Sequence, residues 1–218
     1  AIRSFHILKD QDFTLILPVC FDLPKMDENL HLKLEEMFKE EISLLRTQRT
    51  LLFSSARVEM LRLHLAQRNF KDYNTLIDLK GFSKIRNTGL LLAQALSIEM
   101  VIFMDNDEVI ENPDYLDVAS EYLDQRFNGK RVGGKGGFYL NPDGSILLPP
   151  RKLWWDWLWD KIRWMNQTYL EILKSKERLV PTPMLLGGNL VLHYRLFQSV
   201  PFDPLIPRGE DTDYLINA

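Results

Sequence analysis

Apolar residues in the first half of the chain alternate between two spacings. Unbroken apolar runs, typical of buried strands, fall at residues 14–20, 51–54 and 99–104, with a weaker one at 73–79. Between them, apolar residues recur every three or four positions, which predicts helices over 27–47, 57–67 and 84–97, and another from 112–114 onward. This order predicts an α/β fold with a mainly parallel sheet flanked by helices.

The pattern changes in the second half. A glycine-rich stretch at 133–137 is followed by short apolar runs on either side of an Asn-Pro-Asp-Gly turn at 141–144, which predicts short strands there. A helix is expected over 154–177, carrying all five tryptophans, and a strand over 190–192. We therefore expect a smaller antiparallel region and a tryptophan-rich helical insertion beside the main sheet.

Composition narrows the class of protein. The 218 residues include 27 Lys and Arg against 30 Asp and Glu, a formal net charge of −3, which argues against non-specific nucleic-acid binding. A hydrophobic content of 45% excludes a disordered chain, and the single Cys20 cannot form an internal disulfide. With no targeting or membrane-spanning segment, a single cytoplasmic domain is expected. The chain stops inside an expected helix at 215–218, so part of the C-terminal region is expected to be missing.

Two carboxylates follow the strongest apolar run. Asp105 and Asp107 come directly after residues 99–104. Ligands bind at the carboxyl ends of parallel strands, and alternate residues of an extended chain point the same way. Mg²⁺ and Mn²⁺ prefer such oxygen ligands. The alternative is a strand end made of turn-forming Asp and Asn.

Two further segments gather charge at expected helix starts. Lys84 and Arg86 open the helix before that strand, where free N–H groups favour anions; the alternative is a solvated first turn. Near the end of the chain, Glu210, Asp211 and Asp213 cluster after Gly209. They either complement the helix dipole or supply a general base.

Taken together, these segments resemble the GT-A (Rossmann-like) fold of nucleotide-sugar glycosyltransferases, in particular the large family 2 group. The resemblance extends over about residues 14–216 and rests on five motifs in order. They are a strand ending Leu-Pro-Val-Cys-Phe-Asp at 17–22, Ile-Arg-Asn-Thr-Gly at 85–89, Phe-Met-Asp-Asn-Asp at 103–107, Gly-Gly-Asn at 187–189 followed by Arg195, and Phe-Asp with Gly-Glu-Asp-Thr-Asp at 202–213.

The resemblance implies transfer of a sugar from a UDP- or GDP-type donor to a hydroxyl of a carbohydrate or lipid-linked acceptor. Residues 14–110 would bind the donor and 111–218 the acceptor. Asp107 and Asp105 would hold Mn²⁺ or Mg²⁺, Asp211 would be the base of an inverting reaction, and Glu210 would assist it. The remaining implied residues are, for the donor, Pro18, Val19, Asp22, Lys84, Arg86, Asn87, Asp105 and Asn106, and for the acceptor Gly187, Gly188, Asn189 and Trp154.

Alternatives stay open at this point. A sugar nucleotidyltransferase has a similar sheet, but residues 20–24 contain no glycine for its phosphate loop. A catalytically inactive nucleotide-sugar-binding protein is the other alternative. For the tryptophans, the simplest interpretation is burial in the core. They could instead form an acceptor platform, or a peripheral membrane contact with Lys152, Lys161 and Arg163.

Overall fold

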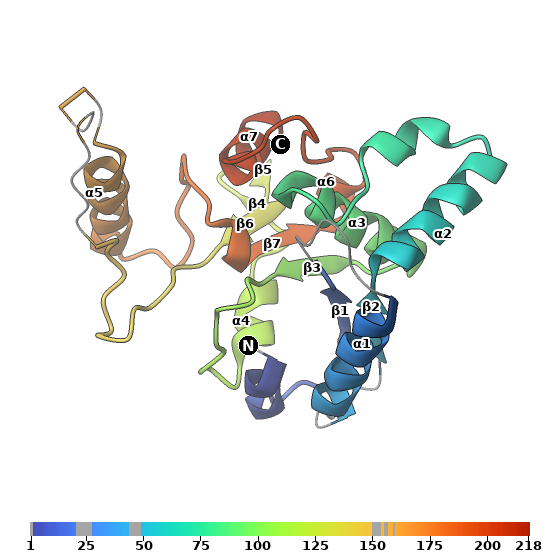
Figure 1. Cartoon of the computed structure of the whole chain (residues 1–218). Helices are drawn as coiled ribbons and strands as arrows, with labels where there is room; N and C mark the ends of the chain where they lie inside the picture. The colour runs from blue at the N-terminus through green and yellow to red at the C-terminus, as the bar shows by residue number, and fades with distance from the viewer. Residues whose placement is uncertain (1, 21–27, 44–48, 150–153, 155–156, 159) are drawn as a thin grey trace.

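The computed structural model describes residues 2–20, 28–43, 49–149, 154, 157–158 and 160–218, and shows an α/β arrangement (Figure 1). The strands are β1 (Thr14–Pro18), β2 (Arg49–Phe53), β3 (Met100–Phe103), β4 (Arg126–Phe127), β5 (Lys130–Arg131), β6 (Gly134–Gly136) and β7 (Leu190–His193). The α-helices are α1 (Glu28–Ser43), α2 (Ser55–Gln67), α3 (Phe82–Ala95), α4 (Tyr115–Ser120), α5 (Lys161–Lys174), α6 (Tyr194–Phe197) and α7 (Glu210–Asn217). Short 3-10 helices are η1 (Ile2–Ile7), η2 (Lys71–Thr75) and η3 (Gly187–Asn189).

Strand pairing departs from a mainly parallel sheet. β1 and β2 pair in parallel, with Ile16 opposite Leu51. β3 pairs antiparallel with β7, and β7 pairs antiparallel with β6, giving the order β3-β7-β6. Among the described strands, the parallel prediction therefore holds for β1 and β2 alone. Hydrophobic runs predict that a strand is buried, but they do not specify its partner or direction.

The strand predicted for residues 73–79 is wrong. Ile77 and Leu79 are buried as expected, but η2 and a bend occupy this stretch. The backbone N–H of Asp78 donates to the Thr88 hydroxyl at 3.2 Å, and that hydroxyl donates to the Asp78 carbonyl at 3.1 Å. A side chain of α3 therefore satisfies backbone groups that a neighbouring strand would otherwise bond.

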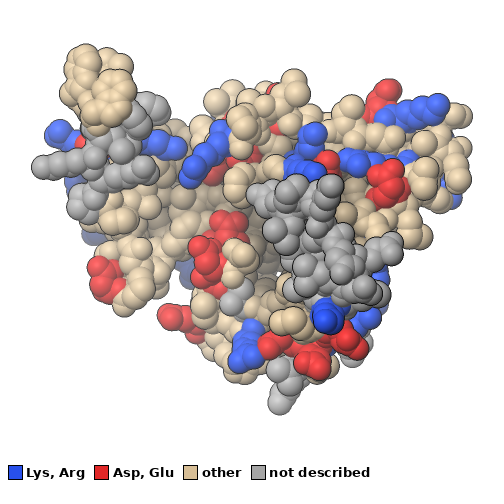
Figure 2. Space-filling model, viewed as in Figure 1, with Lys and Arg blue, Asp and Glu red and all other residues tan. Residues whose placement is uncertain are grey.

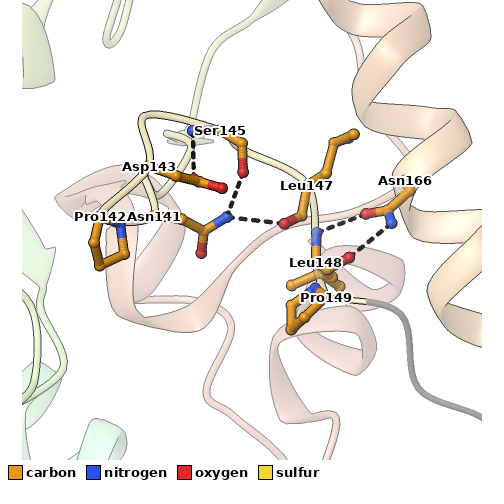
Figure 3. A pocket seen from close by; sticks show the side chains of 8 residues that line it. All are labelled: Asn141, Pro142, Asp143, Ser145, Leu147, Leu148, Pro149 and Asn166. Carbon is orange, nitrogen blue, oxygen red and sulfur yellow. Dashed lines mark hydrogen bonds between the residues drawn. The ribbon is translucent and has the colours of Figure 1, made fainter.

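The short strands predicted around the turn at 141–144 are also not formed. The turn itself is present, with the N–H of Gly144 donating to the Asn141 carbonyl at 2.8 Å. Beyond it, two asparagine side chains bond the backbone in place of a partner strand (Figure 3). Asn141 donates to the carbonyl of Leu147, and Asn166 accepts from the N–H of Leu148, both at 2.8 Å.

The predicted helix at 154–177 is shorter than expected, because α5 begins at Lys161. Its N-cap is Asp160, whose carboxylate accepts from the backbone N–H of Arg163 at 2.9 Å. Trp154 and Trp157 precede it, and Trp164 lies in its first turn. All three are exposed, so the prediction that the tryptophans pack in the core is wrong for them. Trp155 and Trp159 lie outside the described residues.

The main core lies between β7 and the helices α3 and α7. Leu190 and Leu192 of β7 are fully buried with Leu90 and Ala93 of α3. Aromatic rings continue this core toward the C-terminus, where Phe202 stacks on Tyr214 at 4.2 Å and meets Phe103 edge-on at 5.9 Å. Since Phe103 ends β3 and Tyr214 belongs to α7, this packing brings the end of β3 close to the start of α7.

Candidate functional site

A short loop at residues 105–108, the acidic loop, follows the end of β3. Asp105, Asn106 and Asp107 are exposed, whereas Glu108 is half-buried. The loop is closed on itself, because the Asp105 N–H donates to the Glu108 carboxylate and the Glu108 N–H donates to the Asp105 carbonyl, both at 3.2 Å. Figure 2 shows a group of acidic side chains at the centre of this face, beyond the end of β3 as placed in Figure 1.

The Gly-Gly-Asn segment, η3, lies directly against this acidic loop. A Cβ atom at Gly188 would lie 2.5 Å from Oδ2 of Asp105 and would also overlap the Glu108 carboxylate. A Cβ at Gly187 would lie 2.9 Å from the Cζ atom of Arg86. A side chain at either position would displace the Arg86 guanidinium or the carboxylates of Asp105 and Glu108, so these glycines allow a close approach.

Arg86 and Glu210 form a buried ion pair that joins α3 to α7. The side chains are 9% and 8% exposed, and the guanidinium of Arg86 donates to the Glu210 carboxylate. The same guanidinium lies 5.8 Å from the ring centre of Phe103 and 5.6 Å from that of Phe202. Arg86 therefore holds the first turn of α7 against the end of β3, a structural role that its place at a helix start did not reveal.

Negative charge accumulates around Asp105. Partial burial is the largest cause of its raised pKa, and the charges of Asp107, Glu210 and Asp211 raise the pKa further. The guanidinium of Arg86 opposes them. Carboxylates from the β3 loop and from α7, more than a hundred residues apart in the chain, thus act on one another through space. Such a site favours a cation.

Two tyrosines, both missed from the sequence, support this site. The hydroxyl of Tyr139 donates to the Glu108 carboxylate and accepts from the N–H of Gly188. Burial raises the pKa of Glu108 to about 7, against the lowering effect of that hydrogen bond. Burial likewise raises the pKa of Tyr115 to about 12, and its hydroxyl donates to Oδ1 of Asn189 at 2.9 Å. Tyr139 thus links the acidic loop directly to η3.

Of these three supporting residues, only Glu108 could have been found from the sequence. It directly follows the Asp-Asn-Asp run, so it could have been included with the candidate ligands. Tyr115 and Tyr139 lie in segments without any motif, and only the folded chain brings them to η3.

Asn87 and Asn189 are used by the fold. Asn87 is buried, and its side-chain amide donates to the carbonyl of Phe202 and accepts from the N–H of Phe202, both at 2.8 Å. Asn189 accepts from Tyr115, and its amide nitrogen donates to the carbonyl of Phe138 at 3.3 Å. These amides hold the segments around the acidic loop in place.

The other predicted site residues lie at several separate places in the chain. Pro18 ends β1 and is exposed, and Val19 is buried with its N–H donating to the Phe53 carbonyl at 2.9 Å. Lys84 lies in the first turn of α3 and is half-buried. Asp22 lies outside the described residues. Trp154 precedes α5, in a part of the molecule that Figure 1 shows apart from the end of β3.

Within the described residues, the site holds no preformed cluster of metal ligands. In the described part of the chain, no three His, Cys, Asp or Glu side chains come together as a metal-binding group. Mg²⁺ commonly takes only one or two protein carboxylates, and the phosphates of a substrate complete its ligands. The accessible carboxylates of Asp105 and Asp107, in an acidic surrounding, fit that mode of binding.

A hollow of about 620 Å³ lies elsewhere, between the 141–149 segment and α5 (Figure 3). Its polar groups are largely bonded to one another, since Asn141 bonds Ser145 at 2.9 Å and Asn166 donates to the Leu148 carbonyl at 3.0 Å. It contains none of the carboxylates of the acidic site.

Comparisons of the chain with protein-family models, with curated proteins and with solved structures give no match.

Proposed function

We propose that this protein is a metal-dependent glycosyltransferase that moves a sugar from a nucleoside-diphosphate sugar to an acceptor hydroxyl. One observation carries the proposal. Four of the five motifs that resemble family 2 glycosyltransferases converge at one place: Gly188 backs onto Asp105 and Glu108, Gly187 backs onto Arg86, and Arg86 pairs with Glu210.

The acidic loop supplies the cation and donor side of the site. Asp107 and Asp105 would hold Mn²⁺ or Mg²⁺, which when bound neutralises charge on the leaving diphosphate. Asp105 is accessible to a ligand, and the surrounding carboxylates leave its negative charge only partly compensated by Arg86. Lys84 and Asn106 remain candidates for donor contacts, as do Pro18, Val19 and Asp22. Assignment of this α/β chain to the GT-A fold belongs to this proposal as well.

The first turn of α7 supplies the acceptor side. The attacking hydroxyl must lose a proton, and a nearby carboxylate can take it because the hydroxyl becomes more acidic as its oxygen bonds to the sugar. Asp211 is half-buried in this turn, and its charge reaches Asp105. In the proposal, its carboxylate takes the proton in an inverting transfer. Glu210 is committed to Arg86, so it positions Asp211 rather than competing with it.

Two other functions use the same site. A sugar nucleotidyltransferase would also place a divalent ion at Asp105 and Asp107, but it would need a glycine-rich phosphate loop after β1, where the sequence at 20–24 has no glycine. A catalytically inactive protein of this kind would bind the nucleotide sugar without turnover. The convergence of Asp211 with the acidic loop favours the transferase.

The test is thermal unfolding in the presence of UDP- and GDP-sugars, with Mn²⁺ or with excess chelator. Because a ligand that binds only the folded state raises its stability, a donor sugar should raise the melting temperature only when the metal is present. Asp107→Asn should remove that increase. Asp72→Asn, an exposed carboxylate in η2, is the matched control and should leave it unchanged. A donor that stabilises the protein equally in chelator would refute the metal-dependent site.

The base is tested separately. Asp211→Asn should lower turnover by about 10²–10⁴-fold while leaving the donor-dependent increase in melting temperature intact. Retention of the donor's anomeric configuration in the product, measured by NMR, would contradict a single base at Asp211.

A further inference from the structure

Four large apolar side chains, lying just before α5 or in its first turn, are exposed. We define the tryptophan tip as Trp154, Trp157, Leu158 and Trp164. Trp154 and Trp157 are each 80% exposed, Leu158 is 76% exposed and Trp164 is 41% exposed. Figure 1 shows α5 itself away from the sheets. Soluble proteins rarely expose so many large apolar side chains together unless they contact something else.

The inner face of α5 holds this helix in place. On that face, Tyr169 is buried and packed edge-on against Phe138 at 5.3 Å. On the same face, Asn166 bonds both backbone groups of Leu148, at 2.8 and 3.0 Å. The exposure of the tip is therefore not explained by the packing of the helix that carries it.

Cationic side chains lie next to the tryptophan tip in the sequence. Lys161 and Arg163 are exposed and alternate with Ile162 and Trp164 at the start of α5. Figure 2 shows Lys and Arg side chains in this part of the molecule. Tryptophan places an apolar ring and a polar N–H at a boundary between water and hydrocarbon. Lysine and arginine beside it attract anionic headgroups. The cores of protein–protein interfaces, in contrast, are depleted of lysine.

We propose that the tryptophan tip binds the surface of an anionic lipid membrane, so that the protein is attached peripherally. None of the helices in the described residues is long and apolar enough to span a bilayer. The rings of Trp157 and Trp164 and the side chain of Leu158 enter the headgroup region, and Lys161 and Arg163 contact lipid phosphates. This inference goes beyond the proposed function and does not depend on it.

The test is flotation of the full chain with vesicles of phosphatidylcholine alone or mixed with phosphatidylglycerol. The protein should bind the mixed vesicles, and more weakly at high salt because charge attraction is screened. Trp157→Ser with Leu158→Ser should weaken binding by at least roughly tenfold, since two exposed apolar side chains no longer insert. Leu205→Ser, another exposed leucine (84%) outside the tip, is the matched control and should bind normally.

A charge variant separates the two contributions. Lys161→Glu with Arg163→Glu should remove the preference for anionic vesicles, and it should fold normally because acidic residues are favourable in the first turn of a helix. Absence of vesicle binding by the natural chain would overturn the proposal, as would equal binding by the Trp157→Ser, Leu158→Ser variant. Without vesicle binding, self-association that this variant abolishes would identify the tip as an interface between copies of the chain.

Discussion

The buried ion pair between Arg86 and Glu210 gives the sharpest test of how this fold is held together. Both side chains are less than 10% exposed, and the described structure gives Glu210 no other cationic partner. Replacing Arg86 with alanine would leave the Glu210 carboxylate buried and unpaired. Breaking a buried pair in this way typically costs about 3–5 kcal/mol. The guanidinium also lies over the rings of Phe103 and Phe202, so its removal loses contacts there too.

We therefore expect Arg86→Ala to lower the free energy of unfolding by about 3–5 kcal/mol, measured by urea denaturation. In a chain of this size, that corresponds to a fall of about 6–20 °C in melting temperature. Arg178→Ala is the matched control, because its ion pair with Glu121 is exposed and should contribute less than about 1 kcal/mol.

A double-mutant cycle identifies the cause. Arg86→Met keeps the aliphatic part of the side chain, and Glu210→Met removes the partner charge. If the loss comes from an unpaired buried charge, the double variant should be more stable than the sum of the single effects predicts, by about 0.5–3 kcal/mol. Additive effects, or a cost below about 1 kcal/mol for Arg86→Ala, would refute the reasoning and return Arg86 to the role of a free phosphate-binding residue.

The remaining predictions concern the packing of the site. Burial raises the pKa of Glu108 to about 7, so the folded state holds a proton that the unfolded chain releases near pH 4.5. The stability that this proton contributes is therefore fully present below pH 4.5 and is lost as the pH rises toward 7. Glu108→Gln should therefore be more stable than the natural chain at pH 8, by at most about 2 kcal/mol after solvent screening, and the gain should vanish at pH 4 in urea titrations with chelator. Tyr214→Phe should keep or raise stability, by up to about 1 kcal/mol, because the buried hydroxyl has no hydrogen-bond partner in the described residues; a calorimetric loss greater than that would reveal one. Gly188→Ala should cost about 1 kcal/mol or less in stability, because its Cβ would meet only the movable ends of the Asp105 and Glu108 side chains. It should nevertheless weaken metal-dependent donor binding, because those carboxylates must shift; normal binding by this variant would show that the close approach is unimportant.

The sequence located most helices and the strands of the core, because their spacing is local. The helix expected over 84–97 is α3 at Phe82–Ala95, and the run at 99–104 contains β3 at Met100–Phe103. The strand prediction at 73–79 is wrong for a physical reason. Its apolar residues are buried as a strand's would be, but Thr88 bonds the backbone of Asp78, and no local pattern announces that contact.

The direction in which the strands pair could not be predicted from the sequence, because it depends on the tertiary structure. β3 pairs antiparallel with β7, about ninety residues later in the chain, so the alternating order of the first half could not reveal its partner. The start of α5 was likewise set by the Asp160 cap rather than by the apolar tryptophans, which lie exposed before it.

For the candidate site, the sequence by itself determined which residue types were available and where each lies along the chain. A carboxylate after a strand, a carboxylate at a helix start and a pair of glycines are all recognisable locally. These features selected Asp105, Glu210 and Gly188. Only the tertiary structure decided that Arg86 is paired with Glu210 rather than open to a phosphate, and that Tyr139 joins the acidic loop to η3. The physical reason is that burial and pairing depend on segments far apart in the chain, whereas spacing and residue type are properties of each segment alone.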